Sequence, residues 1–272
     1  MTLKHLVVDG VEIAYLDRGK GPAVIIAHCS SASHKEWLPL IETLEPDWRV
    51  LAPDFIGYGR SDAWPEGKVF TGKADLAVLL ALAKKTKKRV HLVGHSYGAA
   101  MALEAARELG PKVESLTLVE PVSFNLLRVE GRPEWTEIEK LGVAVLSAVS
   151  NGKDREAAAA FMRYWLGRLR WWLSPEKFKA AITATIHKVA LEFMILIEAD
   201  KKLSEYASVT VPTLLIAGGK TPAPTRAVVD MLGATLPNAE VRVIKGAGHM
   251  SPFTHPSEVN RMIAGHLAAR RQ

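Results

Sequence analysis

The chain of 272 residues has a single cysteine, Cys29, and this scarcity excludes two kinds of stabilisation. One thiol cannot form an intrachain disulfide, and it cannot supply the paired cysteines of a structural zinc site. We interpret Cys29 as a buried, unreactive thiol rather than as a nucleophile. The histidines show no metal-ligand spacing, so the sequence predicts no metal and no other cofactor.

Long apolar runs are also missing. No stretch approaches the roughly 18 apolar residues that identify a membrane-spanning helix. The first ten residues, MTLKHLVVDG, contain no apolar signal core. We therefore expect a soluble, cytoplasmic protein with no membrane partner.

The excess of one sign of charge is small, because 35 basic and 29 acidic residues leave a formal charge of +6. The densest basic run, Lys84 to Arg89, has no nucleic-acid-binding motif or aromatic residues around it. We interpret this run as the solvated end of a helix and expect no nucleic-acid partner. The length suffices for one large domain with an insertion.

Strand and helix patterns alternate along most of the chain. Such alternation predicts a parallel sheet that is covered by helices on both faces. The first two strands flank Asp9-Gly10, which is typical of a hairpin turn. Strands are expected at 3–8, 11–16, 23–27, 50–52, 90–93, 116–119, 213–217 and 241–244, and helices at 37–44, 76–83, 99–106 and 259–269.

Residues 122–208 break this alternation, since they contain helical patterns and no convincing strand. We interpret them as a helical cap inserted into a core formed by residues 1–121 and 209–272. The segment is rich in aromatic residues, which together favour an apolar roof over a binding pocket. The residues expected to line that pocket are Cys29, Trp165, Trp171, Trp172 and Phe193.

The most informative motif is GHSYG at residues 94–98, which follows a short apolar strand and precedes an Ala-rich helical pattern. This is Gly-x-Ser-x-Gly in a strand–turn–helix context, where a sharp turn lifts the serine hydroxyl clear of the sheet. The turn also directs the first N–H groups of the helix at a nearby anion. The motif predicts Ser96 as a nucleophile, whereas the neighbouring His95 is expected to point away from the reacting centre.

A serine hydroxyl is a poor nucleophile until a base takes its proton. His249 is the candidate base, because it follows the last expected strand in the sequence KGAGHM. The small residues before it allow a loop to carry the ring across the strand ends. We interpret His28 as a structural histidine near the end of another strand.

Taken together, these motifs resemble the α/β-hydrolase fold superfamily, and its serine hydrolases and carboxylesterases in particular. The matching pieces are HCS at 28–30, the stretch 54–62, GHSYG at 94–98 and GAGH at 246–249, in the family's order. The resemblance implies an α/β fold with a mostly parallel eight-stranded sheet, flanking helices and an inserted helical cap.

The resemblance also implies an oxyanion hole, since a tetrahedral intermediate requires two preorganised N–H donors. One donor is expected at Tyr97, the residue after the nucleophile. The other is expected at Ser30, in the loop after the third strand, where Cys29 replaces the family's usual glycine. The Ser30 hydroxyl could add a third contact.

The orienting acid departs from the usual pattern of the family. Many relatives have an aspartate after the strand that follows the cap, but here that place holds Thr221, and residues 211–229 contain no carboxylate. The family's second position is the end of the strand before the cap, where Glu120 stands 24 residues past Ser96. We therefore predict Glu120 as the acid. The alternative is a structural glutamate, with His249 oriented by a backbone or hydroxyl group.

The sequence thus predicts a serine hydrolase that cleaves a small to medium apolar carboxylic ester through an acyl-enzyme intermediate. A serine nucleophile argues against epoxide or halide displacement. Lactone, thioester, amide or carbon–carbon bond hydrolysis on the same triad stays open, as does a non-catalytic ligand receptor with this fold. The substrate's identity and the oligomeric state are not indicated.

Overall fold

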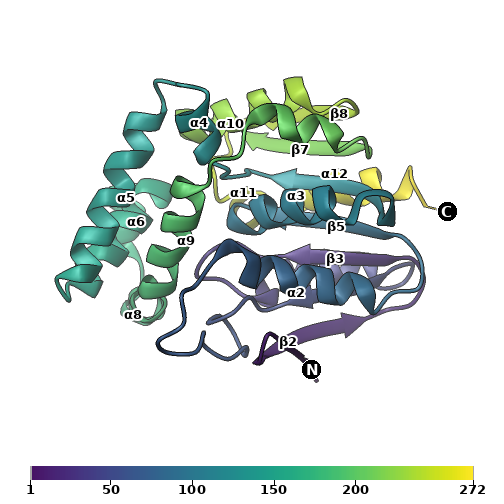
Figure 1. Ribbon diagram of the computed structural model, residues 1–272, viewed down its shortest axis with the longest axis horizontal. Coiled ribbons are helices and arrows are strands. Elements are labelled where there is room, and N and C mark those ends of the chain that lie inside the picture. The colour runs from purple at the N-terminus through teal and green to yellow at the C-terminus, as the bar shows by residue number, and fades with distance from the viewer. Residues whose placement is uncertain (1, 272) are drawn as a thin grey trace.

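The short apolar segments between turn residues pair into one eight-stranded sheet, as the computed structural model of residues 2–271 shows (Figure 1). The strand order is β1-β2-β4-β3-β5-β6-β7-β8, with β2 antiparallel to both of its neighbours and the remaining pairs parallel. The expected fold class is therefore confirmed. The strands are β1 (Lys4–Val8), β2 (Val11–Arg18), β3 (Ala23–Ala27), β4 (Arg49–Pro53), β5 (Val90–His95), β6 (Val113–Val119), β7 (Thr213–Gly218) and β8 (Ala239–Ile244).

Helices cover both faces of this sheet. Apolar side chains of α2, α3 and α10 form the core on one face, and those of α1 and α12 form the core on the other. The expected helices are all present, whereas α10 and α11 of the core have no counterpart among them. The core helices are α1 (Leu38–Leu44), α2 (Gly72–Lys84), α3 (Tyr97–Leu109), α10 (Ala223–Thr235), α11 (Ser251–Thr254) and α12 (Pro256–Ala268), with 3-10 turns η1 (His34–Trp37), η2 (Gly110–Lys112) and η3 (Leu203–Ser208).

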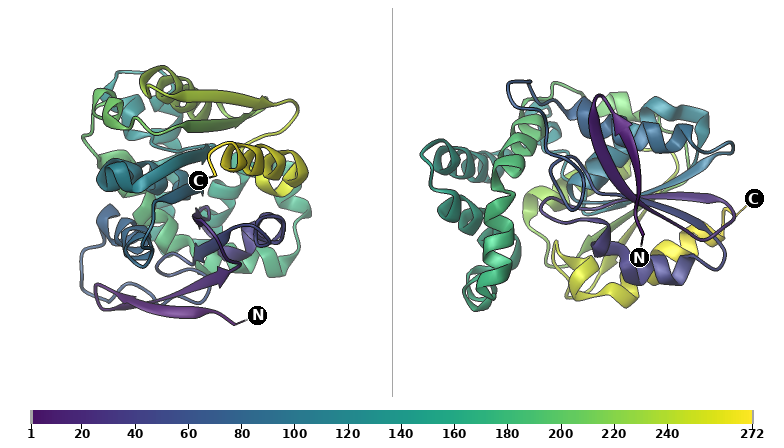
Figure 2. Two further views of the ribbon diagram at one scale, coloured as in Figure 1. Left: turned by 90° about the vertical axis from the view of Figure 1, so that its right-hand side faces the viewer. Right: turned by 90° about the horizontal axis from the view of Figure 1, so that it is seen from below.

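The segment between β6 and β7 forms a helical layer of its own beside the sheet (Figures 1 and 2), which we call the helical insertion. It has a separate apolar core that includes Val145, Phe161 and Phe193. No strand occurs within this segment, as the sequence pattern predicts. Its helices are α4 (Asn125–Val129), α5 (Trp135–Ser150), α6 (Asp154–Leu166), α7 (Arg168–Leu173), α8 (Glu176–Ala184) and α9 (Ile186–Glu198).

Within residues 2–271, no single helix is long and apolar enough to cross a membrane. Only the pair α8 and α9, bent by 54° relative to each other, reaches that length and composition together. Buried side chains of α9, including Ile186 and Val189, belong to the apolar core of the insertion.

Parallel pairing aligns the carboxyl ends of the three strands that carry the candidate site. Val119 of β6 pairs with His95 of β5 and with Ile216 of β7. The next residues continue this contact, since the Ser96 N–H donates to the Val119 carbonyl and the Glu120 N–H to the Ile216 carbonyl, both at 2.9 Å. The ends of neighbouring strands therefore bring Ser96 and Glu120 to one edge of the sheet.

The start of α3 lies unusually close to the end of β3, and only glycine fits there. A Cβ atom at Gly98 would lie 2.4 Å from the carbonyl oxygen of His28 and 2.6 Å from that of Ala27. Both obstacles are backbone atoms, which cannot swing away as the end of a flexible side chain could.

We expect Gly98→Ala to lower the free energy of unfolding by about 3 kcal/mol, because the methyl group forces the helix away from β3. Gly265 of α12 is the matched control, since it lies in a helix with no atom within 4 Å of its Cβ position. Gly265→Ala should raise stability by about 0.5–1 kcal/mol. Urea unfolding at unchanged m-value measures both, and a Gly98→Ala variant as stable as the parent would contradict the close approach.

Candidate active site

Ser96 occupies a strained turn between β5 and α3. Its backbone angles are φ 54° and ψ −117°, a region that non-glycine residues rarely adopt. The turn is tight, because a Cβ atom at Gly94 would lie 2.3 Å from the carbonyl oxygen of Gly98. The two glycines of the motif are thus required by the backbone, as the sequence suggests.

His249 lies against Ser96, with its Nε2 atom 2.9 Å from the Ser96 hydroxyl oxygen. The loop after β8 carries it there, and its ring stacks on Trp165 of α6 at a centroid distance of 3.8 Å. Burial lowers the pKa of His249 below its ordinary value, although the nearby Glu120 carboxylate acts in the opposite direction. The imidazole is therefore neutral at pH 7 and can accept a proton.

Glu120 contacts the other ring nitrogen of this histidine, with its Oε2 atom 3.2 Å from Nδ1 of His249. Burial opposes ionisation of Glu120, but hydrogen bonds from His249, Thr221 and Gly218 outweigh it and hold its pKa below the ordinary value. The Thr221 hydroxyl donates to Oε2 and the Gly218 N–H to Oε1. Thr221, at the end of the neighbouring strand, therefore stabilises the Glu120 carboxylate.

The loop after β3, residues 28–31, is held by both backbone groups of Cys29. Its N–H donates to Glu36 Oε2 at 2.8 Å, and its carbonyl accepts from His28 Nδ1 at 2.7 Å. His28 is thus structural, as expected. Positive φ occurs at Ser31 (57°) and not at Cys29, so the loop does not need glycine at residue 29. Burial raises the pKa of the Cys29 thiol well above its ordinary value, which fits an unreactive thiol.

The side chains of Tyr97 and Ser30 are both held by a buried ionic cluster. The Tyr97 hydroxyl donates to Asp75 Oδ2 at 2.8 Å, and the Ser30 hydroxyl donates to Glu192 Oε2 at 2.5 Å. Lys188 joins the two carboxylates, at 2.7 Å from each. The Ser30 hydroxyl therefore has a partner away from Ser96, and its proposed third contact in the oxyanion hole is not supported. The cluster links α9 of the insertion to the core.

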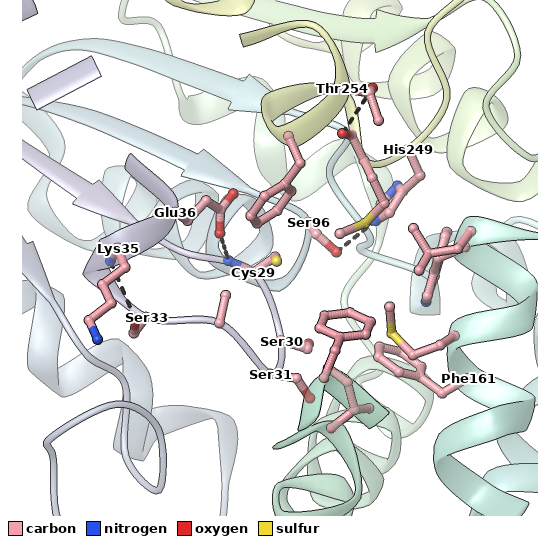
Figure 3. Close-up of a pocket in the computed structure, with 18 residues that line it drawn as sticks. Cys29, Ser30, Ser31, Ser33, Lys35, Glu36, Ser96, Phe161, His249 and Thr254 are labelled. Atoms are coloured by element: carbon pink, nitrogen blue, oxygen red, sulfur yellow. Dashed lines mark hydrogen bonds between the residues drawn. The ribbon is translucent and has the colours of Figure 1, made fainter. Parts of the chain in front are cut away.

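A cavity of about 390 Å³ opens beside Ser96, between the insertion and the ends of the strands (Figure 3). Its wall toward the insertion is apolar, and its opposite wall carries the serine-rich loop after β3. Cys29 and Trp165 line it, as predicted. The other large apolar side chains that line it are Phe161, Met162, Leu166, Phe178, Ile182, Met250 and Phe253.

Three aromatic residues predicted for the pocket lie elsewhere. Trp171 and Phe193 are buried within the apolar core of the insertion, where they pack on their neighbouring helices. Trp172 is 72% exposed and faces solvent. The assignment of these three to the pocket is wrong because the composition of a helix does not reveal which of its faces turns toward the core.

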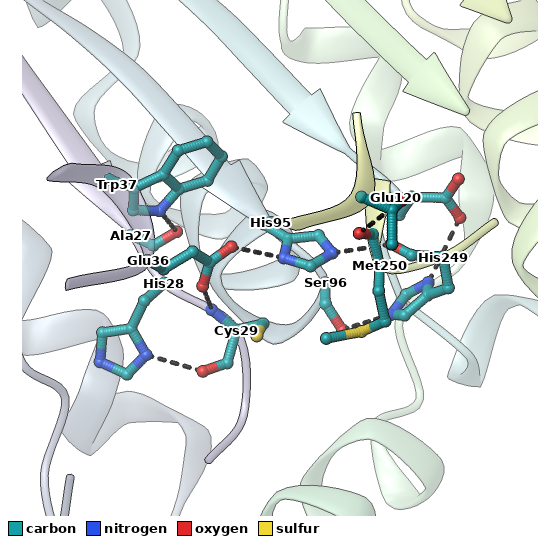
Figure 4. Close-up of polar contacts among 11 residues, drawn as sticks. Ala27, His28, Cys29, Glu36, Trp37, His95, Ser96, Glu120, His249 and Met250 are labelled. Carbon is teal, nitrogen blue, oxygen red and sulfur yellow. Dashed lines mark hydrogen bonds and ion pairs between the residues drawn. The ribbon is translucent and has the colours of Figure 1, made fainter. Parts of the chain in front are cut away.

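His95 does not point away from the reacting groups, contrary to expectation. Its ring centroid lies 5.3 Å from that of His249, and its Nε2 atom lies 3.0 Å from the His249 carbonyl oxygen (Figure 4). The strained turn at Ser96 directs the side chain of His95 behind Ser96, toward the loop that carries His249.

Comparison with known proteins agrees with this geometry. The model of the alpha/beta hydrolase fold family matches residues 22–256. A putative 2-succinyl-6-hydroxy-2,4-cyclohexadiene-1-carboxylate synthase of Bacillus subtilis (strain 168) is 24% identical, over 98% of this chain and 99% of its own length.

Solved structures show the same fold. A hydrolase from Pseudomonas aeruginosa PA01 superposes with a TM-score of 0.79 at 24% identity, covering 97% of this chain and 98% of its own. An enol-lactonase from Burkholderia xenovorans LB400 gives a TM-score of 0.77 at 19% identity, covering 97% and 100%. The family match spans most of the chain, and the fold is shared over nearly all of it. This chain therefore belongs to the alpha/beta hydrolase fold family.

Proposed function

We propose that this protein is a serine hydrolase that cleaves a small to medium-sized carboxylic ester. The observation that carries the proposal is the continuous set of contacts from Glu120 to His249 to Ser96, at 3.2 Å and 2.9 Å, which ends at an apolar cavity. In this proposal residues 1–121 and 209–272 form the catalytic core, and residues 122–208 act as a cap that supplies the roof.

In the first half of the reaction, Ser96 attacks the ester carbonyl while its proton passes to His249 Nε2. The carbonyl oxygen becomes negatively charged, and backbone N–H groups are suited to receive it. Tyr97 is the first residue of α3, where the N–H has no partner within the helix. The Cys29 N–H already donates to Glu36. The Ser30 N–H is therefore the donor that we expect from this loop to the negatively charged oxygen.

Collapse of the intermediate expels the alcohol, which takes the proton from His249, and leaves the acyl group on Ser96. Water then attacks the acyl-enzyme with His249 again as the base, and the carboxylic acid leaves. Glu120 acts through His249 in both halves. Its carboxylate holds the proton on Nδ1, so that Nε2 is free to accept, and it stabilises the imidazolium that forms.

The size and lining of the cavity support a compact, apolar ester as the substrate. The cavity presents apolar and aromatic side chains to a substrate, and its volume of about 390 Å³ suits a compact molecule. A lactone is a cyclic ester that the same steps would open, and the likeness to an enol-lactonase is consistent with a substrate of this kind. Comparing kcat/KM for a lactone with kcat/KM for an open-chain ester would distinguish the two kinds of substrate.

We expect the purified protein to hydrolyse p-nitrophenyl esters, with kcat/KM rising from acetate toward hexanoate. Each methylene that becomes buried contributes about 0.8 kcal/mol at most, which is roughly fourfold in kcat/KM. Initial rates across the series measure this gradient. A flat or falling gradient would show that the acyl group does not enter the apolar cavity.

Ser96→Ala is the control for this series and should abolish turnover. A fluorophosphonate should add to the parent once and not to Ser96→Ala, as measured by intact mass. An adduct on another residue, or a parent that binds esters without turnover, would contradict the proposal and favour a ligand receptor.

Glu120→Gln should fold normally and lose about 10²–10⁴ in kcat, because the amide no longer stabilises charged His249. Thr221→Val removes only a hydroxyl donor to the same carboxylate and should stay within about tenfold of the parent. Steady-state kinetics on one ester compare the two variants. Near-parent turnover by Glu120→Gln would mean that Ser96 and His249 act as a dyad.

The pH profile of kcat/KM should show an acid limb that belongs to His249. Protonated His249 cannot accept the Ser96 proton, so activity is lost as the pH falls through its pKa. Burial lowers that pKa, so the midpoint should lie below 6.5, the ordinary value for histidine. Glu120→Gln should move the midpoint lower still, since the carboxylate favours the charged ring. A midpoint above 6.5 in the parent would contradict the burial argument.

A further inference from the structure

A second buried acid–histidine pair lies behind the nucleophile. His95 Nδ1 is 2.6 Å from Glu36 Oε1, and both side chains are fully buried. The other ring nitrogen, Nε2, is 3.0 Å from the His249 carbonyl oxygen. With Glu36 as a carboxylate, both partners are acceptors only, so each ring nitrogen must carry a proton to form its hydrogen bond. Beside an ionised Glu36, the contacts are satisfied together only when His95 is an imidazolium.

Glu36 extends this contact to the loop after β3, because its second oxygen accepts the Cys29 N–H at 2.8 Å. A single path of hydrogen bonds therefore runs from Cys29 through Glu36 and His95 to the backbone of His249 (Figure 4). It connects the oxyanion loop (residues 28–31), the turn at Ser96 and the base loop (residues 245–250).

The charges around His95 favour its protonated form. Burial alone lowers the pKa of His95, but the Glu36 carboxylate and the His249 carbonyl outweigh it and raise the pKa above its ordinary value. The other titratable groups near the ring are Glu120, His249 and the Cys29 thiol. Glu120 is a further negative charge, while His249 and Cys29 are held neutral by burial.

We propose that Glu36 and His95 are positioning residues that, as a carboxylate–imidazolium pair, hold the oxyanion loop, the nucleophile and the base in one arrangement. The proposal rests on the serine hydrolase mechanism given above. Neutral His95 would lose one of its two bonds. A lone pair on Nε2 repels the His249 carbonyl, and a lone pair on Nδ1 repels Glu36, which in turn holds Cys29. Deprotonation therefore releases either the base loop or the oxyanion loop.

A metal site is the alternative for the same side chains, since ligand atoms of Cys29, Glu36 and His95 lie within 4.8 Å of one another. The hydrogen bonds argue against it. Both Glu36 oxygens and both His95 nitrogens already have partners with good geometry, and the Cys29 thiol stays protonated. These hydrogen bonds account for both oxygens of Glu36 and both ring nitrogens of His95.

Two variants at Glu36 separate the contacts from the charge. Glu36→Leu removes both hydrogen bonds at similar volume. Glu36→Gln can restore them without charge: its carbonyl accepts the Cys29 N–H, and its amide donates to Nδ1 of neutral His95, whose Nε2–H still reaches the His249 carbonyl. The readouts are kcat and KM for p-nitrophenyl butyrate and the rate of Ser96 labelling by a fluorophosphonate, with folding checked by circular dichroism.

At pH 7 we expect Glu36→Leu to lose about 10- to 100-fold in kcat and in labelling rate, with KM within about threefold, because misplacing groups by about 1 Å has that cost. Glu36→Gln should stay within about fivefold of the parent. A folded Glu36→Leu with parental kcat would overturn the proposal, and so would a Glu36→Gln as slow as Glu36→Leu. If Glu36→Leu fails to fold, the pH profile of Glu36→Gln decides.

The parent's labelling rate should fall on an alkaline limb above pH 6.5 as His95 loses its proton, and Glu36→Gln should lack that limb. His91 is the matched control, because it is buried on the same strand with its pKa lowered to about 4. His91→Gln should keep the alkaline limb. A limb that persists in Glu36→Gln, or a parent with none up to pH 10.5, would overturn the role of the charge.

A third measurement does not depend on activity. In ¹⁵N-histidine-labelled protein, His95 should show two protonated ring nitrogens at pH 7, whereas His91 should show one. His95→Gln assigns the signals. A single protonated nitrogen on His95 would overturn the ion pair. A parent that shows the ion pair but neither turnover nor Ser96 labelling would instead contradict the proposed hydrolase function.

Discussion

The close approach of α3 to the end of β3 is the constraint on which the rest of the site depends. Because no side-chain atom separates Gly98 from the carbonyls of Ala27 and His28, the helix N-terminus begins beside the loop after β3. Ser96 and Ser30 thereby come to line the same cavity. Parallel strand pairing then places Glu120 one strand away, and the loop after β8 needs only to carry His249 between them.

Much of this arrangement could be predicted from the residues, and what could not has a physical reason. A motif such as GHSYG reflects the small residues that a tight strand-to-helix turn requires, so the sequence alone predicted the turn around Ser96. The prediction of Glu120 combined the absence of any carboxylate near Thr221 with the second acid position that the family resemblance implies. His95 was misjudged, since the direction of a side chain in a strained turn depends on contacts with Glu36 and the base loop, which are far away in the sequence.

The sequence predicted the extent of the helical insertion, but it did not predict which of its side chains line the cavity. Aromatic residues occur on several of its helices, and only those on one face of α6 and α8 reach the cavity, such as Phe161, Trp165 and Phe178. The buried cluster of Lys188, Glu192 and Asp75 could not be predicted from the sequence either, because charged residues in a helical pattern ordinarily face solvent. Their burial became apparent only once α9 lay against α2 and the loop after β3.

The hydrogen bond between Thr221 and Glu120 has a consequence for how such a site can change over time. The side chains at residues 120 and 221 come from adjacent strands and meet at one point beside His249. A negative charge at that point is what the imidazole needs, and the fold offers two places from which to supply it. A carboxylate placed at residue 221 would therefore reach the same point as one at residue 120, without any movement of Ser96 or His249.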